Sequence, residues 1–112
     1  MKDKDKELLM QAIDSYDAYS PSYRIILKLL VDLSIDNIAN ITVLKLSKIS
    51  SLSREIIYQA LRTMEKDNFI ELSKPNRGKI NAIILKDTKL NQVIQYYNKI
   101  LETQNKYKLS VQ

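Results

Sequence analysis

The stretch that decides the fold is residues 46–70, LSKISSLSREIIYQALRTMEKDNFI, which has the pattern of two helices broken by one tight turn. Leu46, Ile49 and Leu52 give the first helix and the turn a shared apolar side. Ser53 follows where a second helix would take its N-terminal cap, because its hydroxyl can accept a hydrogen bond from a free backbone N–H. The sequence therefore predicts a short helix, a turn and a second helix.

The predicted second helix covers residues 54–67 and has two unlike sides. Ile57, Leu61 and Met64 are spaced four and three residues apart, so they share one side of the helix. The opposite side carries the polar side chains of Arg54, Glu55, Tyr58, Gln59, Arg62 and Lys66. Such a helix pair, with a basic and hydrogen-bonding outer side, is typical of a helix-turn-helix, whose second helix fits the major groove of DNA.

The composition predicts one globular domain over residues 1–112. Its 45% hydrophobic and 28% charged residues are ordinary for a soluble protein, and a chain of 112 residues buries one core rather than two. No apolar run approaches the roughly 18 residues of a membrane span, and the N-terminal MKDKDKELL lacks the apolar centre of a signal peptide. These features predict a cytoplasmic protein that does not contact a membrane.

The residue types that the chain lacks argue against catalysis and metal binding. With no Cys and no His, the chain has no disulfide and no thiolate, and a tetrahedral zinc site is excluded. The commonest general base and the thiol nucleophile are therefore both missing. A single Gly leaves no room for a glycine-rich phosphate loop. We expect no enzyme activity, no catalytic residues, no cofactor and no metal.

The net charge of +5 is distributed unevenly along the chain. Residues 1–20 carry three lysines against five acidic residues, which gives −2. Residues 53–86 carry seven Lys and Arg against four acidic residues, which gives +3. Positive charge attracts the phosphate backbone of DNA, although a lysine-rich surface is in many proteins simply solvated.

Periodicity and turn residues divide the remaining chain. The predicted segments are a charged tail at 1–6, helices at 7–19, 21–35 and 88–105, and strands within FIELS (69–73) and KINAIIL (79–85). Ser20 and Pro21 form a cap with proline in the first helical position, and Thr42 is a cap for the helix that carries Leu46. Ile41 is a candidate for a very short strand. Asn68 stands where a helix commonly ends in a left-handed residue.

The two predicted strands form a hairpin with a basic tip. Pro75 suits the second position of the turn, and Gly78, the single glycine of the chain, can take the positive φ that closes it. Ile80, Ala82 and Ile84 alternate onto one face of the second strand. The basic residues of the tip are Lys74, Arg77 and Lys79.

This order of elements resembles the winged helix-turn-helix family of DNA-binding proteins. The family's L-A-x-x-x-G-L-S-R run stands here as LSKISSLSR at 46–54, and its later V-x-x-A-L-x-x-L-x-x-x-G-L-I run ends here at Asn68, Phe69 and Ile70. Ser51 and Asn68 replace the two glycines of the pattern. The added terminal helices are similar in outline to those of dimeric regulators of the multiple-antibiotic-resistance (MarR) and phenolic-acid-repressor (PadR) types. The resemblance implies a mainly α fold with a small β-hairpin at 70–85 and a winged core at 21–85.

The resemblance also implies a set of DNA contacts. Gln59 and Arg62 can make bidentate hydrogen bonds to adenine and guanine edges, respectively. Arg54 is expected to contact a base edge or a phosphate, and sugar or phosphate contacts are expected from Ser53, Tyr58, Lys66, Lys45 and Lys48. At the wing tip, Lys74, Arg77 and Lys79 are expected to reach the minor groove or its flanking phosphates. Each has a plainer interpretation: Ser53 as a cap alone, Tyr58 as a half-buried packing residue, and the tip lysines as protection of an exposed hairpin against aggregation.

The leading functional hypothesis is a homodimeric transcription regulator that binds double-stranded DNA. The apolar stripes around Ile13 and Ile94 must be buried, either on the chain's own core or, as we favour, against a second copy through the terminal helices. The alternatives are a plasmid- or phage-type protein that binds replication origins, and a winged-helix protein-interaction module without DNA. A small-molecule effector between the terminal helices and the core has no sequence motif to support it.

Overall fold

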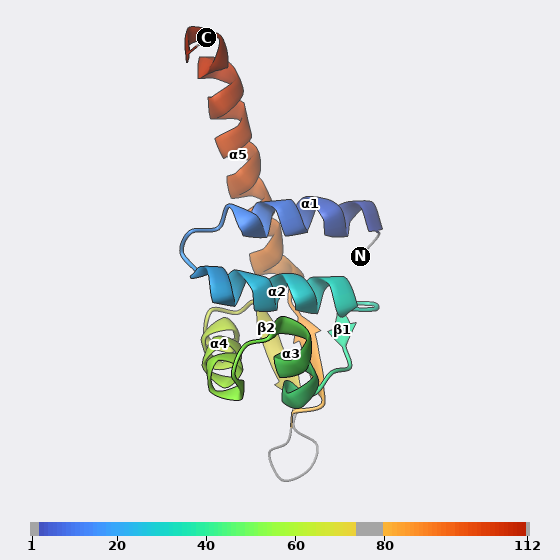
Figure 1. Cartoon of the computed structure of the whole chain (residues 1–112). Coiled ribbons are helices and arrows are strands. Elements are labelled where there is room, and N and C mark those ends of the chain that lie inside the picture. The colour runs from blue at the N-terminus through green and yellow to red at the C-terminus, as the bar shows by residue number, and fades with distance from the viewer. Residues whose placement is uncertain (1–2, 74–79, 112) are drawn as a thin grey trace.

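The computed structural model describes residues 3–73 and 80–111, which form five helices and a small three-stranded sheet (Figure 1). In chain order the elements are α1 (Asp3–Asp14), α2 (Pro21–Leu33), β1 (Ile38–Ala39), α3 (Val43–Ser50), α4 (Arg54–Lys66), β2 (Ile70–Ser73), β3 (Ala82–Leu85) and α5 (Asp87–Val111). The expected mainly helical fold with a small β-hairpin is confirmed.

Three helices begin at the caps that the sequence predicts. The side-chain oxygens of Ser20, Thr42 and Ser53 accept hydrogen bonds from the backbone N–H groups three residues later, at 3.3, 3.1 and 3.2 Å. Each cap satisfies a backbone donor that the helix itself leaves free, and contributes about 1 kcal/mol.

The predicted boundaries of the first two helices were wrong. α1 begins at Asp3 rather than at residue 7, and it ends at Asp14 rather than at residue 19. It ends early because Tyr16 and Tyr19 leave the helical path to pack against Phe69, with ring centroids 5.7 and 5.3 Å apart. α2 ends at Leu33, two residues before the predicted end.

The short strand lies at Ile38–Ala39, and Ile41, its predicted place, is outside the sheet. Asp36 and Asn37 have φ values of 52° and 65°, and together they make the tight turn that precedes the strand. Ile35 and Ile38 exchange backbone hydrogen bonds of 2.9 and 3.0 Å across this turn. Because this turn reverses the chain at residues 36 and 37, the strand begins at Ile38, three residues before its predicted position.

The sheet is antiparallel, with β3 in the middle of the order β1-β3-β2. Ile38 pairs with Ile84 on one side of β3, and Ile70 pairs with Leu85 on the other. The buried face of β3 carries Ile83 and Leu85, whereas Ala82 and Ile84 are partly exposed. The predicted hairpin tip at 74–79 lies outside the described residues.

The core lies between α1, α2, α4 and the sheet. α2 is its centre, as its mainly apolar sequence predicts, and buries Ile26, Leu27, Leu30 and Val31. α1 lies along α2 and α5 and buries Leu9, Ala12 and Ile13 in the chain's own interior. In the described part of the chain, no helix combines the length and the apolar character needed to cross a bilayer.

α5 is longer than the predicted 88–105 and extends beyond the rest of the molecule (Figure 1). Its 25 residues correspond to a rod of about 37 Å. Leu90 and Val93, near its beginning, are buried. Tyr96 and Tyr107, further along, are 52% and 55% exposed. The end of α5 is therefore not part of the core.

Candidate nucleic-acid interface

The turn between α3 and α4 is fixed by hydrogen bonds from serine side chains. Ser47 Oγ donates to the Leu52 carbonyl oxygen at 2.6 Å, and the Leu52 N–H donates to Ser50 Oγ at 3.2 Å. Ser51 takes the left-handed conformation, with φ 62° and ψ 20°, at the position where the winged-helix pattern has glycine. A side chain in this conformation costs roughly 1–2 kcal/mol, which the surrounding bonds offset.

α4 is anchored by its inner face. Ile57, Ala60, Leu61 and Met64 have no exposed surface. Burying a Leu, Ile or Met side chain stabilises a fold by about 1.5–3 kcal/mol each. The position of α4 on the sheet and on α2 is therefore set by this face, and its outer face makes no contribution to the core.

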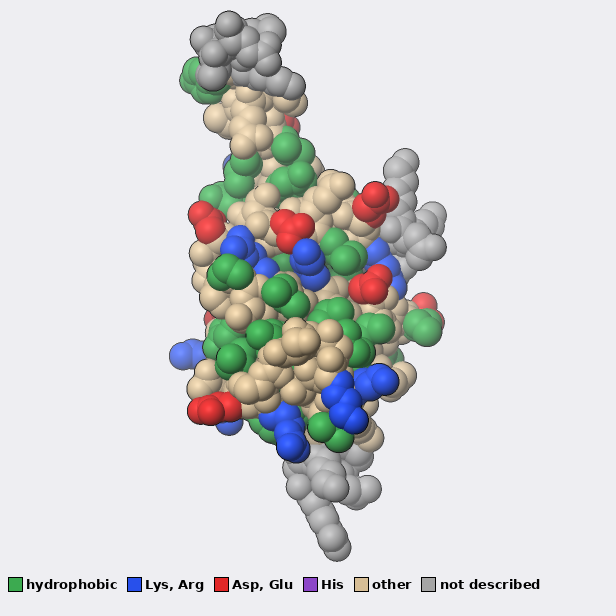
Figure 2. All heavy atoms as spheres, viewed as in Figure 1, with side chains coloured by type: hydrophobic (Ala, Val, Ile, Leu, Met, Phe, Trp, Pro, Cys, Tyr) green, Lys and Arg blue, Asp and Glu red, His purple; other side chains and the backbone are tan. Residues whose placement is uncertain are grey.

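The outer face of α4 carries the polar residues that the sequence places there. Ser53, Arg54, Glu55, Gln59, Arg62 and Lys66 are exposed, and Tyr58 is 43% exposed. Lys45 and Lys48 are exposed on the preceding helix α3. Figure 2 shows basic side chains gathered over the end of the molecule that carries α3 and α4.

These basic residues are not paired with carboxylates within residues 3–73 and 80–111. The one ion pair found there joins Lys28 to Asp14 at 2.7 Å, on the helices above. Two acidic residues near the end of α4 are directed to partners in the protein: Glu65 Oε2 accepts from the Leu72 N–H at 3.1 Å, and Asp67 Oδ2 accepts from the Tyr19 hydroxyl at 2.7 Å. The Lys and Arg side chains of α3 and α4 are therefore available to interact with an external anion.

The C-terminus of α4 is closed by Asn68, whose φ is 67°. The Phe69 N–H donates to the Met64 carbonyl at 2.9 Å and the Asn68 N–H donates to the Glu65 carbonyl at 3.1 Å, which is the Schellman arrangement. The predicted left-handed residue is confirmed. Asn tolerates this conformation better than most residues with a side chain.

Sequence reasoning missed the aromatic cluster that fixes this end of α4. Tyr19 is 6% exposed and lies 5.3 Å from both the Tyr16 and the Phe69 rings, measured between centroids. Burial raises the pKa of Tyr19, and the hydrogen bond to Asp67 raises it further. Burial also raises the pKa of Tyr16, followed by the charge of Asp67. Tyr19 therefore stays protonated and donates to Asp67 at all ordinary pH values.

The predicted wing-tip residues Lys74, Arg77 and Lys79 lie outside the described residues. The strands that lead to the tip are described as far as Ser73 and Ala82, which pair with each other. The described part of the hairpin therefore ends at this pair of residues.

The described residues hold no group of three or more Asp and Glu side chains placed to bind a metal ion. A hollow of about 390 Å³ lies between α1, the Asn37 turn and the start of α5. Its lining includes Leu8, Asp87 and Asn91.

No protein-family model and no curated protein matches this chain in sequence. Several solved structures resemble it in fold. Staphylococcus aureus MepR, described as a transcription regulator of the multidrug efflux pump MepA, aligns with a TM-score of 0.58 and 16% identity over 95% of this chain and 76% of its own. MarR from E. coli aligns with a TM-score of 0.53 and 16% identity over 96% of this chain and 75% of its own.

A third similar structure is that of a chromatin protein. The archaeal chromatin protein TrmBL2, whose structure is described as showing a novel mode of DNA binding, aligns with a TM-score of 0.55 and 16% identity. The alignment covers 96% of this chain but 39% of TrmBL2. Together with the helix, turn, helix and hairpin described above, these similarities show that the chain has the winged helix-turn-helix fold of the MarR-type regulators.

Proposed function

We propose that this chain is a sequence-specific DNA-binding protein that regulates transcription as a homodimer. The observation that carries the proposal is the outer face of α4, where Gln59 and Arg62 are both exposed and lie three residues apart. Arg62 forms no ion pair with a carboxylate of the described residues. An amide and a guanidinium three residues apart on a helix project in similar directions. That face is the one a major groove would receive.

In this proposal, α4 reads base edges. Gln59 bonds to adenine and Arg62 to guanine, and each bidentate pair contributes about 1–3 kcal/mol of discrimination against the wrong base. Ser53, Arg54 and Tyr58 contact sugar or phosphate near the start of α4. Glu55 lies in the first turn of α4, where a carboxylate interacts favourably with the helix dipole.

The remaining basic residues hold the duplex through its backbone. Lys45 and Lys48 on α3 and Lys66 on α4 contact phosphates, and the wing-tip residues Lys74, Arg77 and Lys79 contact the minor groove or its phosphates. Contacts of this kind fix the register of a protein on DNA and carry no sequence information themselves. Each phosphate neutralised steepens the salt dependence of log K by about 0.9.

The proposed homodimer is supported by the unequal burial of the two terminal helices. The stripe of α1 is covered by the chain itself, whereas the end of α5 leaves Tyr96 and Tyr107 more than half exposed. Two reading helices on one dimer would match half-sites separated by about one turn of DNA, roughly 34–36 Å. In this proposal, α5 supplies the surface through which one copy contacts the other.

Selection of bound sequences from a random DNA pool tests the proposal. We expect enrichment of a two-fold symmetric site and a binding constant that falls steeply as salt rises. Repeated sites in one orientation would point to an origin-binding role instead. Failure to bind mixed-sequence DNA even at low salt would refute DNA binding and support a protein-interaction module, since basic DNA readers bind non-specifically under that condition.

A further inference from the structure

One carboxylate, that of Glu55, lies on the outer face of α4 among basic side chains. An α-helix turns by about 100° per residue, so side chains four and then three residues apart follow one line along it. Glu55, Gln59 and Arg62 have this spacing. The fully buried Ile57 and Met64 lie on the opposite side of the helix. Glu55 is therefore at the middle of the outer face, in line with the two proposed base contacts.

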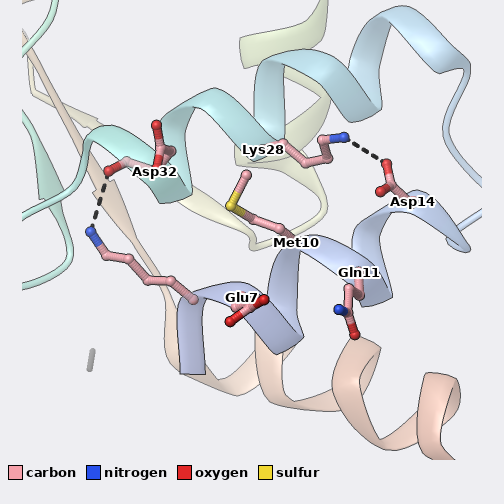
Figure 3. Close-up of a pocket in the computed structure, with 7 residues that line it drawn as sticks. Glu7, Met10, Gln11, Asp14, Lys28 and Asp32 are labelled. Atoms are coloured by element: carbon pink, nitrogen blue, oxygen red, sulfur yellow. Dashed lines mark hydrogen bonds and ion pairs between the residues drawn. The ribbon is translucent and has the colours of Figure 1, made fainter. Parts of the chain in front are cut away.

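Several carboxylates elsewhere in the fold have partners within the protein. Asp14 on α1 forms an ion pair with Lys28 on α2, with 2.7 Å between the nitrogen and the oxygen (Figure 3). Glu65 and Asp67, near the end of α4, accept hydrogen bonds from other parts of the chain. Glu55 is exposed, and within residues 3–73 and 80–111 it has neither an ion pair nor a hydrogen bond through its side chain. Its carboxylate is therefore available to a ligand.

The structural role of Glu55 at the start of α4 is small. A Glu three residues after a cap can bond back to the N–H group of the cap, but the residue at that position after Ser53 is Ile56. Glu55 stands one residue earlier and keeps only the general attraction of a carboxylate to the N-terminal end of the helix dipole. That attraction does not depend on the side of the first turn on which the carboxylate lies. It therefore does not account for the alignment of Glu55 with Gln59 and Arg62.

A carboxylate in the major groove discriminates among base pairs because it can only accept hydrogen bonds. The N4 amino group of cytosine donates in that groove, and Glu and Asp are its usual acceptors. Adenine also has an amino donor there, but its N7 acceptor lies beside that donor, and guanine presents two acceptors. Phosphates repel a carboxylate through their charge. A free carboxylate thus favours a cytosine and opposes binding where it meets no donor.

The spacing of residues on α4 agrees with the stacking of base pairs. Glu55 and Arg62 are seven residues apart. Seven residues correspond to about 10 Å along a helix axis, and base pairs are stacked about 3.4 Å apart, so about three base-pair steps separate the two side chains. Glu55 is the second residue of α4, and the N-terminal residues of a recognition helix are those that contact base edges.

We propose that Glu55 is a specificity-determining residue, whose carboxylate accepts a hydrogen bond from N4 of a cytosine about three base-pair steps from the guanine that Arg62 contacts. Where another base stands at that position, the carboxylate stays unpaired and lowers the affinity. Glu55 thus adds an attraction to the correct site and a penalty on other sites. This inference rests on the DNA binding of the proposed function and adds the residue that excludes wrong sites.

A matched pair of substitutions tests the role of Glu55. Glu55→Gln and Glu102→Gln each remove one negative charge from an exposed side chain, on α4 and on α5 respectively. In fluorescence anisotropy titrations, we expect Glu55→Gln to bind scrambled DNA about threefold or more tightly than wild type, and to lose about tenfold of the preference for the selected site. Glu102→Gln should change both affinities by the same small factor, because it alters only the net charge. Circular dichroism checks that both variants fold.

Selection from a random DNA pool gives a measurement at the level of single bases. Wild type should enrich cytosine at one position of the bound site, whereas Glu55→Gln should lose that cytosine and gain adenine, which an amide side chain prefers. The guanine that depends on Arg62 should remain in both selections. Unchanged base preference in Glu55→Gln, or equal tightening on scrambled DNA by Glu55→Gln and Glu102→Gln, would overturn the inference and leave DNA binding intact. A wild-type chain that binds no DNA at low salt would overturn both this inference and the proposed function.

Discussion

α4 and α5 are both amphipathic helices, but the chain buries the apolar face of α4 completely and that of α5 only in part. Every apolar residue on the inner face of α4 is buried, so its outer face is free to be polar. α5 is nearly twice as long, with 25 residues against 13. Its apolar stripe continues beyond the part of the helix that packs against the core. α4 therefore exposes groups suited to hydrogen bonding, while the second half of α5 exposes apolar surface suited to burial.

The same truncation, Leu to Ala, should have very different effects on stability in the two helices. Leu61→Ala on α4 should lower the free energy of unfolding by about 2–5 kcal/mol, because its fully buried side chain leaves a cavity. Leu101→Ala in the second half of α5 should change the stability of the monomer by less than about 1 kcal/mol, because solvent already reaches that side chain. Urea unfolding at low protein concentration measures both changes in stability, and equal losses would contradict the incomplete burial of the apolar face of α5.

The exposed face of α4 and the predicted wing tip should contribute differently to DNA binding. Arg62→Ala should weaken binding to the selected DNA site by about 1–3 kcal/mol and reduce the preference for it over scrambled DNA. Arg77→Ala should weaken binding to both DNAs about equally, since phosphate contacts carry no sequence information. Fluorescence anisotropy titrations on the two duplexes compare the variants; an unchanged preference in Arg62→Ala would exclude that residue from base reading.

The third prediction concerns the bond that fixes the end of α4. Tyr19→Phe keeps the ring but removes the donor to Asp67, which should cost about 1.5–3 kcal/mol because the acceptor is charged. The pKa of Tyr19 is higher in the folded protein, so its contribution is fully present below the ordinary tyrosine pKa of about 10 and is lost as pH rises above it.

The pH dependence provides the control for this prediction. The stability difference between wild type and Tyr19→Phe should be constant from pH 6 to 9 and then shrink by about 1.4 kcal/mol for each pH unit above 10. Guanidinium unfolding at several pH values measures it. A difference that stays constant to pH 11 would show that Tyr19 does not titrate with a raised pKa.

The smallest expected effect is at the turn that precedes α4. Ser51→Gly removes the left-handed strain of the native state but makes the unfolded chain more flexible, so the net stabilisation should be within about 1 kcal/mol. Ser22→Gly, inside the first turn of α2, should destabilise by about 0.5–1 kcal/mol, since that residue is already helical. Differential thermal unfolding resolves the opposite signs, and a loss in both variants would show that the Ser51 side chain is itself needed.

The features that local chemistry determines could be predicted from the sequence. The caps at Ser20, Thr42 and Ser53 each depend on a hydroxyl and a backbone N–H three residues away, and Asn68 closes α4 because few other residues accept its conformation. The outer face of α4 follows from the period of the helix. These signals lie within one or two turns of chain.

The features that depend on distant contacts could not be predicted. α1 stops at Asp14 because Tyr19 packs on Phe69 and bonds to Asp67, some 50 residues later, and no local signal announces that contact. The strand at Ile38 depends on its pairing with Ile84 in the same way. Alternation in the sequence predicts Ile80, Ala82 and Ile84 on one face of the second strand, but Ile83 and Leu85 are the residues of β3 that are buried. The buried face is set by the pairing of β3 with β2, which the local sequence does not reveal.

Four residues with side chains, Asp36, Asn37, Ser51 and Asn68, adopt positive φ in a chain that has one glycine. Each Cβ raises the native enthalpy locally, and each also limits how many conformations the denatured chain can visit. The two effects oppose each other in the free energy of unfolding, although the enthalpy and the entropy of unfolding each still change. Calorimetry should therefore find large, mutually compensating changes in enthalpy and entropy when glycines are introduced at these positions, with only slight movement of the melting temperature.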